Sequence, residues 1–291
     1  MVVRTITMNS FRLHQKEGLM KKIIKILVLL VFTSFLIAFS GQRVSAAETS
    51  DTFSDVENGI ITIRYNNSTN AKMKIGVTKD SKSYYYDLRN GKNEIDIPLN
   101  MGNGKYALKI LKNISGTKYS VVQSTSIDLE LKDEKVVFLQ SNVIVNFNLE
   151  DKAIKKAESL TKNCKSEEEI ISTIHEFIVK NFAYDYDKIS TLSSGYIPDI
   201  EIIYKDKKGI CYDISAIMAS MLRSQGVEVK LVTGYTPNIA GVYHAWNSVY
   251  DEKTDAWFPL DATYDIAMQK AKRKYKMKKS SSDYSDIKYQ Y

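Results

Sequence analysis

The sequence predicts an α+β protein in which an immunoglobulin-like β-sandwich precedes a domain that mixes helices and strands. Two observations lead to this prediction. Short segments of alternating apolar and polar residues, separated by turn signals, fill residues 57–147, and helical periodicity replaces them near residue 150. The chain of 291 residues is long enough for one or two domains with cores of their own. We expect an export signal in residues 1–47, the β-sandwich in residues 48–149 and the second domain in residues 150–291.

The N-terminal 47 residues have the pattern of an export signal. Basic residues from Lys21 to Lys25 precede an apolar run from Ile26 to Phe39, and Val44-Ser45-Ala46-Ala47 offers the small residues that a signal peptidase reads. The run is short for a membrane span, so we expect cleavage after Ala46 or Ala47, with an uncleaved membrane anchor as the alternative. Met20 is a second candidate for the true start. The protein is therefore expected to be secreted or associated with the cell surface or cell wall.

The net charge of +7 arises almost entirely in this signal segment. Residues 1–47 contain seven of the 41 basic residues and one of the 34 acidic residues, which leaves a net charge of +1 for residues 48–291. A nearly neutral exported chain has no electrostatic basis for binding nucleic acid. We expect contact with a membrane only through the signal segment, before cleavage.

The predicted β-sandwich is based on segments whose apolar residues alternate with polar ones. Four of them are Ile61–Tyr65, Lys72–Val77, Tyr106–Ile110 and Ile127–Leu131. Turn signals such as Asn58-Gly59 and Asn90-Gly91 separate the segments. Many short strands at this spacing favour an immunoglobulin-like sandwich. Neither cysteine of the chain lies here, so a disulfide between the two sheets is not expected.

The pattern after residue 150 is helical at first. Ser166, with Glu169 three residues later, forms a capping box before an apolar stripe that extends to about Phe182. His175 lies beside this stripe and is predicted to be a residue of the helix surface. Residues 184–208 have no regular pattern and are expected to form a long irregular segment, either a wall of a substrate cleft or a surface excursion.

A clear helix–strand unit follows. Apolar residues recur with helical spacing at Ile214, Ile217, Met218, Met221 and Leu222. Gly226 is a stop signal, and Cys211 lies at the helix start. Residues 227–235, 242–250 and 256–263 then read as strands.

Three residues of this unit suit nucleophilic acyl transfer. Cys211 supplies a thiol, His244 a base and Asp261 an orienting carboxylate. A hairpin register that pairs Val249 with Ala256 also places His244 opposite Asp261, on one face of the sheet. Three alternatives remain open: a buried strand histidine, an Asx-turn aspartate, and a disulfide that joins Cys211 to Cys164 in an oxidising compartment.

The local motifs around these residues resemble those of the transglutaminase-like superfamily of papain-type folds. In that family Gly-x-Cys begins a helix, His-Ala-Trp lies in a strand and Asp-x-Thr lies on the next strand. Here the motifs are Gly209-Ile210-Cys211, His244-Ala245-Trp246 and Asp261-Ala262-Thr263. The resemblance covers about residues 150–265, and the chain as a whole resembles secreted two-domain proteins of low-GC Gram-positive bacteria.

The resemblance implies a catalytic triad of Cys211, His244 and Asp261. It also implies attack on an amide carbonyl, a thioester on Cys211, and release to water or to an amine. We expect a thiol enzyme that acts on peptide or isopeptide bonds, with hydrolysis of the cysteine-peptidase kind as the first choice. The alternatives are a protein-crosslinking transamidase and a non-catalytic module that binds cell wall or protein. Tyr204 is the candidate for a second oxyanion donor.

The expected partner is a protein or peptide substrate, associated with the cell wall if the basic residues between Lys270 and Lys279 meet anionic wall polymers. The alternative for this basic run, which its charge pattern favours, is a solvated loop. No cofactor or metal is expected. The sequence has no glycine-rich nucleotide loop, and residues 48–291 contain two histidines, too few for a typical zinc site. Asp185 and Asp187 could contribute to a weak calcium site. The oligomeric state is not predicted.

Overall fold

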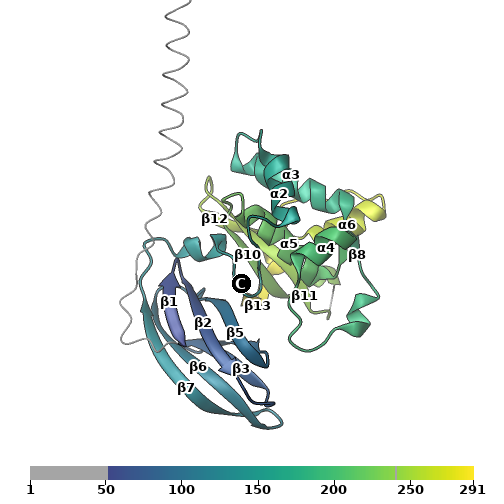
Figure 1. Cartoon of the computed structure of the whole chain (residues 1–291). Coiled ribbons are helices and arrows are strands. Elements are labelled where there is room, and N and C mark those ends of the chain that lie inside the picture. The colour runs from purple at the N-terminus through teal and green to yellow at the C-terminus, as the bar shows by residue number, and fades with distance from the viewer. Residues whose placement is uncertain (1–51, 240) are drawn as a thin grey trace, which may run out of the picture. The chain divides into compact units, whose positions relative to one another are not determined.

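The computed structural model describes residues 52–239 and 241–291 (Figure 1). The expected export signal, its cleavage after Ala46 or Ala47 and the alternative start at Met20 lie outside the described residues. Among the helices that are described, none has the length and apolar character that crossing a bilayer requires.

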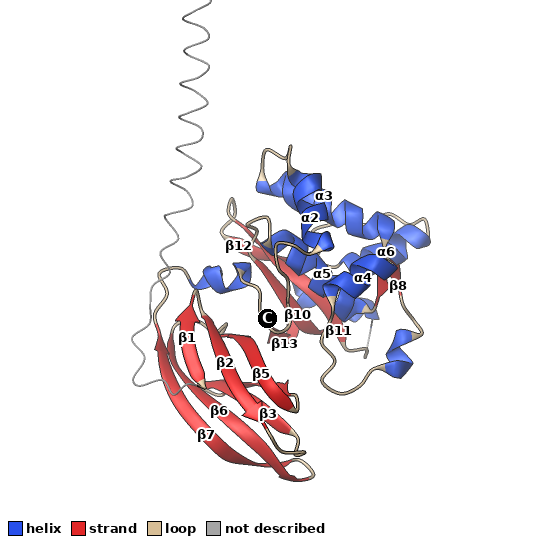
Figure 2. Cartoon of the chain, viewed as in Figure 1, coloured by secondary structure: helices blue, strands red, loops and turns tan. Residues whose placement is uncertain are grey.

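The strand-rich part of the chain forms two antiparallel sheets (Figure 2). Its strands are β1 (Phe53–Glu57), β2 (Ile60–Asn67), β3 (Met73–Lys79), β4 (Lys82–Leu88), β5 (Gly91–Pro98), β6 (Gly104–Ser115) and β7 (Lys118–Leu129). One sheet has the order β1-β2-β5, and the other has the order β4-β3-β6-β7. A 3₁₀ helix, η1 (Glu134–Leu139), follows the last strand.

Alternation of apolar residues explains these strands. Ile61 and Ile63 of one sheet, and Ile75 and Ile110 of the other, are fully buried in the core. The turn Asn58-Gly59 joins β1 to β2, and both of its residues have positive φ (49° and 79°), as a tight hairpin turn requires. The four predicted segments fall within β2, β3, β6 and β7, except that Met73 begins its strand one residue late and β7 ends at Leu129, two residues early.

Residues 152–290 form the α/β part. Its helices are α2 (Lys152–Thr161), α3 (Glu167–Asn181), α4 (Ile200–Asp206), α5 (Cys211–Arg223) and α6 (Ala262–Lys270), with 3₁₀ turns η2 (Lys188–Thr191), η3 (Pro237–Ile239) and η4 (Ser281–Tyr284). Its strands are β8 (Ala183–Tyr184), β9 (Lys208–Gly209), β10 (Val229–Tyr235), β11 (His244–Asp251), β12 (Ala256–Leu260) and β13 (Asp286–Gln290).

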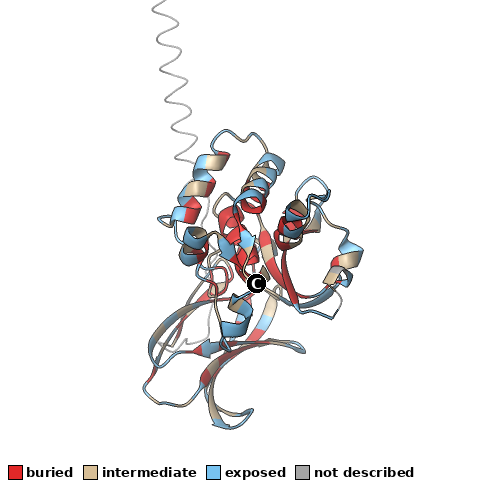
Figure 3. Cartoon of the chain, turned by 90° about the vertical axis from the view of Figure 1, so that its right-hand side faces the viewer, coloured by how far each residue is buried: buried red, intermediate tan, exposed pale blue. Residues whose placement is uncertain are grey.

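Helix α5 is the centre of the α/β part. It packs against strands β10 and β11 of the antiparallel sheet β12-β11-β10-β13, and its other sides contact α2, α3, α4 and α6 (Figures 1 and 2). The five apolar residues whose spacing predicted this helix are fully buried, and Gly226 follows it with a φ of +83°. Figure 3 shows the buried residues concentrated along this helix and the strands beside it. Burial on all sides fixes the helix, and with it the residue at its N-terminus.

The segment from residue 184 to residue 208 is more regular than its sequence indicates. Tyr184 pairs with Gly209 in the short parallel ladder of β8 and β9, and α4 occupies Ile200–Asp206. The Asp199 carboxylate caps α4 by accepting from the N–H groups of its first turn, and Lys207 ends the helix in the left-handed region with a φ of +52°. The expectation of one long irregular segment was wrong here, because a seven-residue helix is too short to produce a visible apolar period.

Candidate active site

Cys211 is the first residue of α5 and is partly exposed. The turn before it is closed by Asp213, whose Oδ2 accepts from the Ile210 N–H at 3.0 Å. This carboxylate lies so close to the chain that a Cβ on residue 209 would be 2.5 Å from the Cβ of Asp213. Glycine at the first position of the Gly-x-Cys motif is therefore required by packing.

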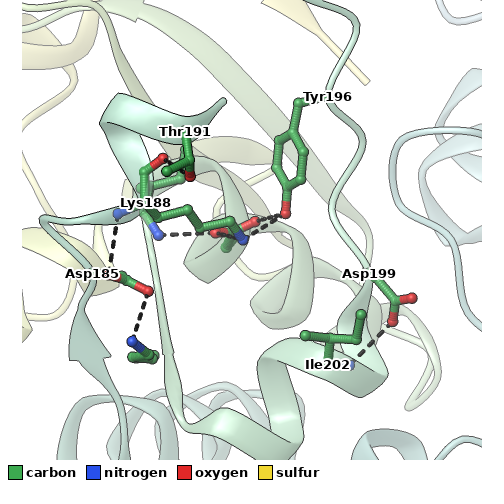
Figure 4. Close-up of polar contacts among 9 residues, drawn as sticks. Asp185, Lys188, Thr191, Tyr196, Asp199 and Ile202 are labelled. Atoms are coloured by element: carbon green, nitrogen blue, oxygen red, sulfur yellow. Dashed lines mark hydrogen bonds and ion pairs between the residues drawn. The ribbon is translucent and has the colours of Figure 1, made fainter. Parts of the chain in front are cut away.

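Asp213 is also the anchor of the segment that runs from β8 to α4. The carboxylate is fully buried, Lys188 Nζ lies 2.6 Å from Oδ2, and the Tyr196 hydroxyl donates to Oδ1 at 2.6 Å (Figure 4). Asp185 accepts from the Lys188 N–H at 3.3 Å and pairs with Lys208 Nζ at 3.2 Å. These charge-assisted bonds attach residues 185–196 to the first turn of α5, the helix that begins with Cys211.

His244, the first residue of β11, is buried and is held from one side by a carboxylate. Its Nε2 lies 2.8 Å from Asp261 Oδ2, so Nδ1 is the nitrogen that remains for the thiol of Cys211. Burial alone would lower the pKa of His244, but its hydrogen bonds to Asp261 and Cys211, together with the charges of both partners, raise that pKa to about 10. A protonated imidazole beside a sulfur stabilises the thiolate form of a cysteine.

Asp261 has two structural roles at once. It lies between β12 and α6, and its Oδ1 accepts from the Tyr264 N–H at 2.9 Å as the N-cap of α6. Its Oδ2 accepts both from His244 and from the hydroxyl of Tyr284, which lies 2.8 Å away. The capping alternative and the orienting role are therefore compatible. Tyr284 was not identified from the sequence, because nothing in its local context indicates that it returns to residue 261.

The predicted hairpin register was wrong by two residues. Strand β11 pairs Val249 with Phe258 and Asp251 with Ala256, which leaves a turn of four residues instead of six. Asp255 adopts a φ of +51° in this turn, which permits the tighter connection. The strand consequently ends at Leu260, and Asp261 begins a helix rather than facing His244 across a ladder. A shift of two residues keeps every side chain on its expected face, and the His244–Asp261 contact survives.

The predicted position of a second histidine, His175, was also wrong. His175 is buried in α3 and not on its surface, and its Nε2 lies 2.9 Å from Asp265 Oδ2. Asp265 is fully buried and also forms an ion pair with Lys279. The apolar stripe of α3 explains the error, since Ile171 and Ile178 lie one turn before and one turn after His175 on the same face.

The remaining candidates can be placed as well. Cys164 and Cys211 are both free thiols, and Cys164 Sγ lies 3.7 Å from the Thr173 hydroxyl. Tyr204 faces the ammonium of Lys207, which lies 3.2 Å from its ring centroid. Within residues 52–239 and 241–291 no three His, Cys, Asp or Glu side chains gather in a group that could hold a metal ion.

This arrangement contains the groups that nucleophilic acyl transfer requires. The thiol lies at the N-terminus of a buried helix, a buried imidazole contacts it, and a carboxylate held by three hydrogen bonds fixes the imidazole. The sequence predicted all three members of this group, and the structure brings them together.

Comparison with known proteins locates the same region. Residues 154–262 match the sequence model of the transglutaminase-like superfamily. UPF0252 protein MJ1282 of Methanocaldococcus jannaschii is 28% identical over 153 residues, and the match covers 48% of this chain and 40% of that protein. This chain therefore spans less than half the length of that curated relative.

Several solved structures match parts of this chain at low sequence identity. A candidate cysteine protease of Cytophaga hutchinsonii is 16% identical, with 70% of this chain and 71% of that chain covered and a TM-score of 0.40. LapG of Legionella pneumophila is 19% identical, with coverage of 48% and 74% and a TM-score of 0.37. Red sea bream transglutaminase is 13% identical, with coverage of 70% and 48% and a TM-score of 0.30. Residues 154–262 of this chain, which contain the cysteine, histidine and aspartate described above, belong to the transglutaminase-like superfamily.

Proposed function

We propose that this protein is an exported thiol enzyme that hydrolyses peptide or isopeptide amide bonds, with Cys211 as nucleophile, His244 as acid and base, and Asp261 as the group that orients His244. The observation that carries the proposal is the contact of one buried imidazole with both a thiol at a helix start and a buried carboxylate. A site that only binds has no use for this combination.

The reaction follows from the positions of these groups. The Cys211 sulfur attacks the carbonyl carbon while its proton is held on His244, and negative charge develops on the carbonyl oxygen. When the C–N bond breaks, His244 gives this proton to the departing amine, and a thioester remains on Cys211. A water molecule then attacks the thioester and gives its proton to His244, which restores the thiolate and releases the acid. Water is our preferred acceptor because it is abundant outside the cell and no group of this site marks a place for an amine.

The strand-rich region supports a proposed immunoglobulin-like sandwich in residues 48–149, with the catalytic domain in residues 150–291. Its sheet orders, β1-β2-β5 and β4-β3-β6-β7, correspond to strands A-B-E and C′-C-F-G of that fold. Tyr106 lies near the start of the sixth strand, is fully buried, accepts from the Met101 N–H at 2.9 Å and donates to the Gly102 carbonyl at 2.7 Å. A tyrosine that bonds back to the preceding corner is a hallmark of such sandwiches.

The proposed location of the protein is the cell surface or the medium. Its proposed substrate is a protein or peptide of the cell wall. The supports are the pattern of residues 1–47, the nearly neutral charge of the exported chain and the basic stretch between Lys270 and Lys279.

The test is the reactivity of the thiols in the purified protein. Iodoacetamide is added without reductant between pH 5 and pH 9, and intact mass is followed for wild type, Cys211→Ala and the matched control Cys164→Ala. We expect fast alkylation of Cys211 well below the pH at which an ordinary thiol reacts, retained in the Cys164→Ala variant. A slow reaction that rises only near pH 8.5, as for an unactivated thiol, would remove the enzyme proposal.

A peptide library containing glutamine and isopeptide bonds separates the two enzymatic reactions, with products identified by mass. Cleavage with uptake of water supports hydrolysis. Incorporation of an added amine such as cadaverine, at a rate that exceeds hydrolysis, would replace it with transamidation. Activated Cys211 without any turnover would favour a binding module.

A further inference from the structure

The three groups of the site lie on different elements. Cys211 is the first residue of α5, His244 is the first residue of β11, and Asp261 follows β12. Their distances from one another therefore depend on how α5 lies on the sheet. A displacement of a reacting group by about 1 Å can cost about 100-fold in rate.

Apolar packing brings α5 onto strands β10 and β11 (Figure 2). Leu231 and Val249 of these strands are fully buried in one cluster with Ile214 and Met218 of the helix. Hydrophobic burial is non-directional and follows the area removed from water, so a small sliding of the helix along the strands changes it little. A directional contact is needed to fix the helix along the strands.

Hydrogen bonds to backbone carbonyls supply this direction at both ends of α5. Near its end, Arg223 Nε donates to the Val229 carbonyl of β10 at 2.9 Å. Near its start, Nδ2 of Asn247 in β11 donates to the Ser215 carbonyl at 3.0 Å, and both residues of this bond are buried. Ser215 lies one helical turn after Cys211, so Asn247 holds the end of α5 that carries the thiol.

Asn247 is also close to the other two groups along the chain and across the sheet. It lies three residues after His244 in β11. Its cross-strand partner in β12 is Leu260, the residue before Asp261. One buried amide therefore connects the helix of the thiol to the strand pair that carries the imidazole and the carboxylate.

This amide has a cost in stability. Its Oδ1 is buried and has no hydrogen-bond partner among residues 52–239 and 241–291. Turning the amide over would direct Oδ1 at the Ser215 carbonyl, where two acceptors would face each other. A buried acceptor without a partner destabilises a fold. An apolar side chain of the same branched shape would avoid this cost, and the Ser215 carbonyl would keep its acceptor role within α5.

We propose that Asn247 is a positioning residue of this site, whose hydrogen bond to Ser215 fixes α5 along β11 and thereby sets the contact between Cys211 and His244. The proposal rests on the function proposed above. Asn247 meets no substrate and moves no proton. A buried group that breaks a rule of core packing is expected where function requires it.

The experiment compares wild type with two variants of Asn247. Asn247→Leu keeps the branched shape without the amide, and Asn247→Ala removes the amide without adding bulk to the core. The matched control is Ser220→Ala, because Ser220 is fully buried in the same helix and its hydroxyl also has no hydrogen-bond partner among the described residues. p-Nitrophenyl acetate acylates the Cys211 sulfur, and the release of p-nitrophenolate at pH 7 measures the rate. Alkylation by iodoacetamide between pH 5 and pH 9 reports the activation of the thiol, and urea unfolding reports stability.

We expect both Asn247 variants to acylate about 10- to 100-fold more slowly, because the thiol and the imidazole are no longer held in one position. Their alkylation profiles should move toward pH 8.5, where an unactivated thiol titrates. Asn247→Leu should unfold at the same urea concentration as wild type or at a higher one, which separates the loss of rate from a loss of stability. Ser220→Ala should leave the rate within about twofold and the profile unchanged.

Acylation within about twofold of wild type in both Asn247 variants, with unchanged alkylation profiles, would overturn the proposal. Equal slowing in Ser220→Ala would also overturn it, since the loss of any buried polar group in α5 would then have the same effect. If wild-type Cys211 is inert toward both reagents, the proposed enzymatic function fails. That outcome is distinct from a reactive wild type whose Asn247 variants are unaffected.

Discussion

Within the described residues, the α/β part contains two buried histidine–aspartate pairs with nearly the same geometry and different surroundings. His244 Nε2 lies 2.8 Å from Asp261 Oδ2, and His175 Nε2 lies 2.9 Å from Asp265 Oδ2. Both carboxylates come from the start of α6, where Asp261 is the N-cap and Asp265 lies in the first turn. The same short segment therefore fixes two imidazoles.

The two pairs differ in the side chains that lie next to the histidine and the aspartate. The free side of His244 meets the thiol of Cys211. The ring of His175 lies next to Tyr275, with centroids 6.2 Å apart, and Asp265 is neutralised by Lys279. A buried histidine–aspartate pair is thus a structural unit that can tie α3 to α6 as well as orient a base. Only the neighbouring thiol makes one of them a candidate for catalysis.

The largest expected effect comes from removing each imidazole in turn. His244→Ala should slow acylation of Cys211 by p-nitrophenyl acetate about 10²- to 10⁴-fold, because the proton acceptor and the charge beside the sulfur are both lost. His175→Ala should leave that rate within about twofold and instead lower the free energy of unfolding by about 3 kcal/mol, because Asp265 loses one of its buried partners.

Urea unfolding and stopped-flow acylation of the two variants measure these effects. A large loss of acylation in His175→Ala, at a denaturant concentration where it remains folded, would show that the two pairs are functionally linked. Retention of acylation in His244→Ala would remove His244 from the mechanism.

The sequence identified one pair and missed the other for a physical reason. Cys211, His244 and Asp261 each lie in a motif whose local pattern indicates its element, so their meeting could be predicted even though the hairpin register was wrong. The turn between β11 and β12 sets that register, and its length depends on Asp255 accepting a positive φ, which the alternating pattern does not encode. A shift of two residues keeps each side chain on the same face of the sheet, so the predicted contact between His244 and Asp261 is still formed.

His175 and Tyr184 show where local pattern is insufficient. The partner of His175, Asp265, is 90 residues away in α6. The contact arises only when α3 packs on α6, so the sequence near His175 does not indicate it. Tyr184 pairs with Gly209 in a two-residue parallel ladder, and no periodicity reveals so short a strand. Strand alternation and the buried stripe of α5 could be predicted, because each repeats often enough to be recognised.

The second largest expected effect distinguishes the roles of the two carboxylates, Asp265 and Asp261. Asp265→Asn removes the charge that neutralises Lys279 and pairs with His175, and it should cost about 3 kcal/mol of unfolding free energy. Asp261→Asn keeps an N-cap for α6 and should cost less, but it should slow acylation about 100-fold by releasing the orientation of His244. Equal losses of stability in the two variants, with no selective loss of acylation in Asp261→Asn, would contradict the division between a structural and a functional pair.

The third effect is a dependence on pH. The folded-state pKa of His244, about 10, lies above the unfolded value of about 6.5. Its contribution to stability is therefore complete below pH 6.5 and is lost as pH rises toward 10. The difference in unfolding free energy between wild type and His244→Gln should narrow across this window, by at most about 1.4 kcal/mol per pH unit. Urea titrations at pH 6, 7, 8 and 9 measure it, and a difference that widens with pH would show that the imidazole is neutral in the folded protein.

The smallest expected effect concerns the tyrosine beside each pair. Tyr284→Phe removes a hydroxyl that donates to Asp261 Oδ2, so His244 and the Tyr264 N–H must hold the carboxylate without it. We expect a loss of about 1 to 2 kcal/mol in stability and about three- to tenfold slower acylation, since one charge-assisted hydrogen bond is lost and the His244–Asp261 contact persists. Tyr275→Phe is the matched control at the other pair and should leave acylation unchanged, because the phenylalanine keeps the ring that lies beside His175. Equal acylation rates in the two variants would show that Tyr284 only fills space beside Trp246, whose ring centroid lies 5.2 Å away. Slower acylation in Tyr284→Phe alone would show that the carboxylate of the functional pair depends on a third partner to hold its imidazole toward the thiol.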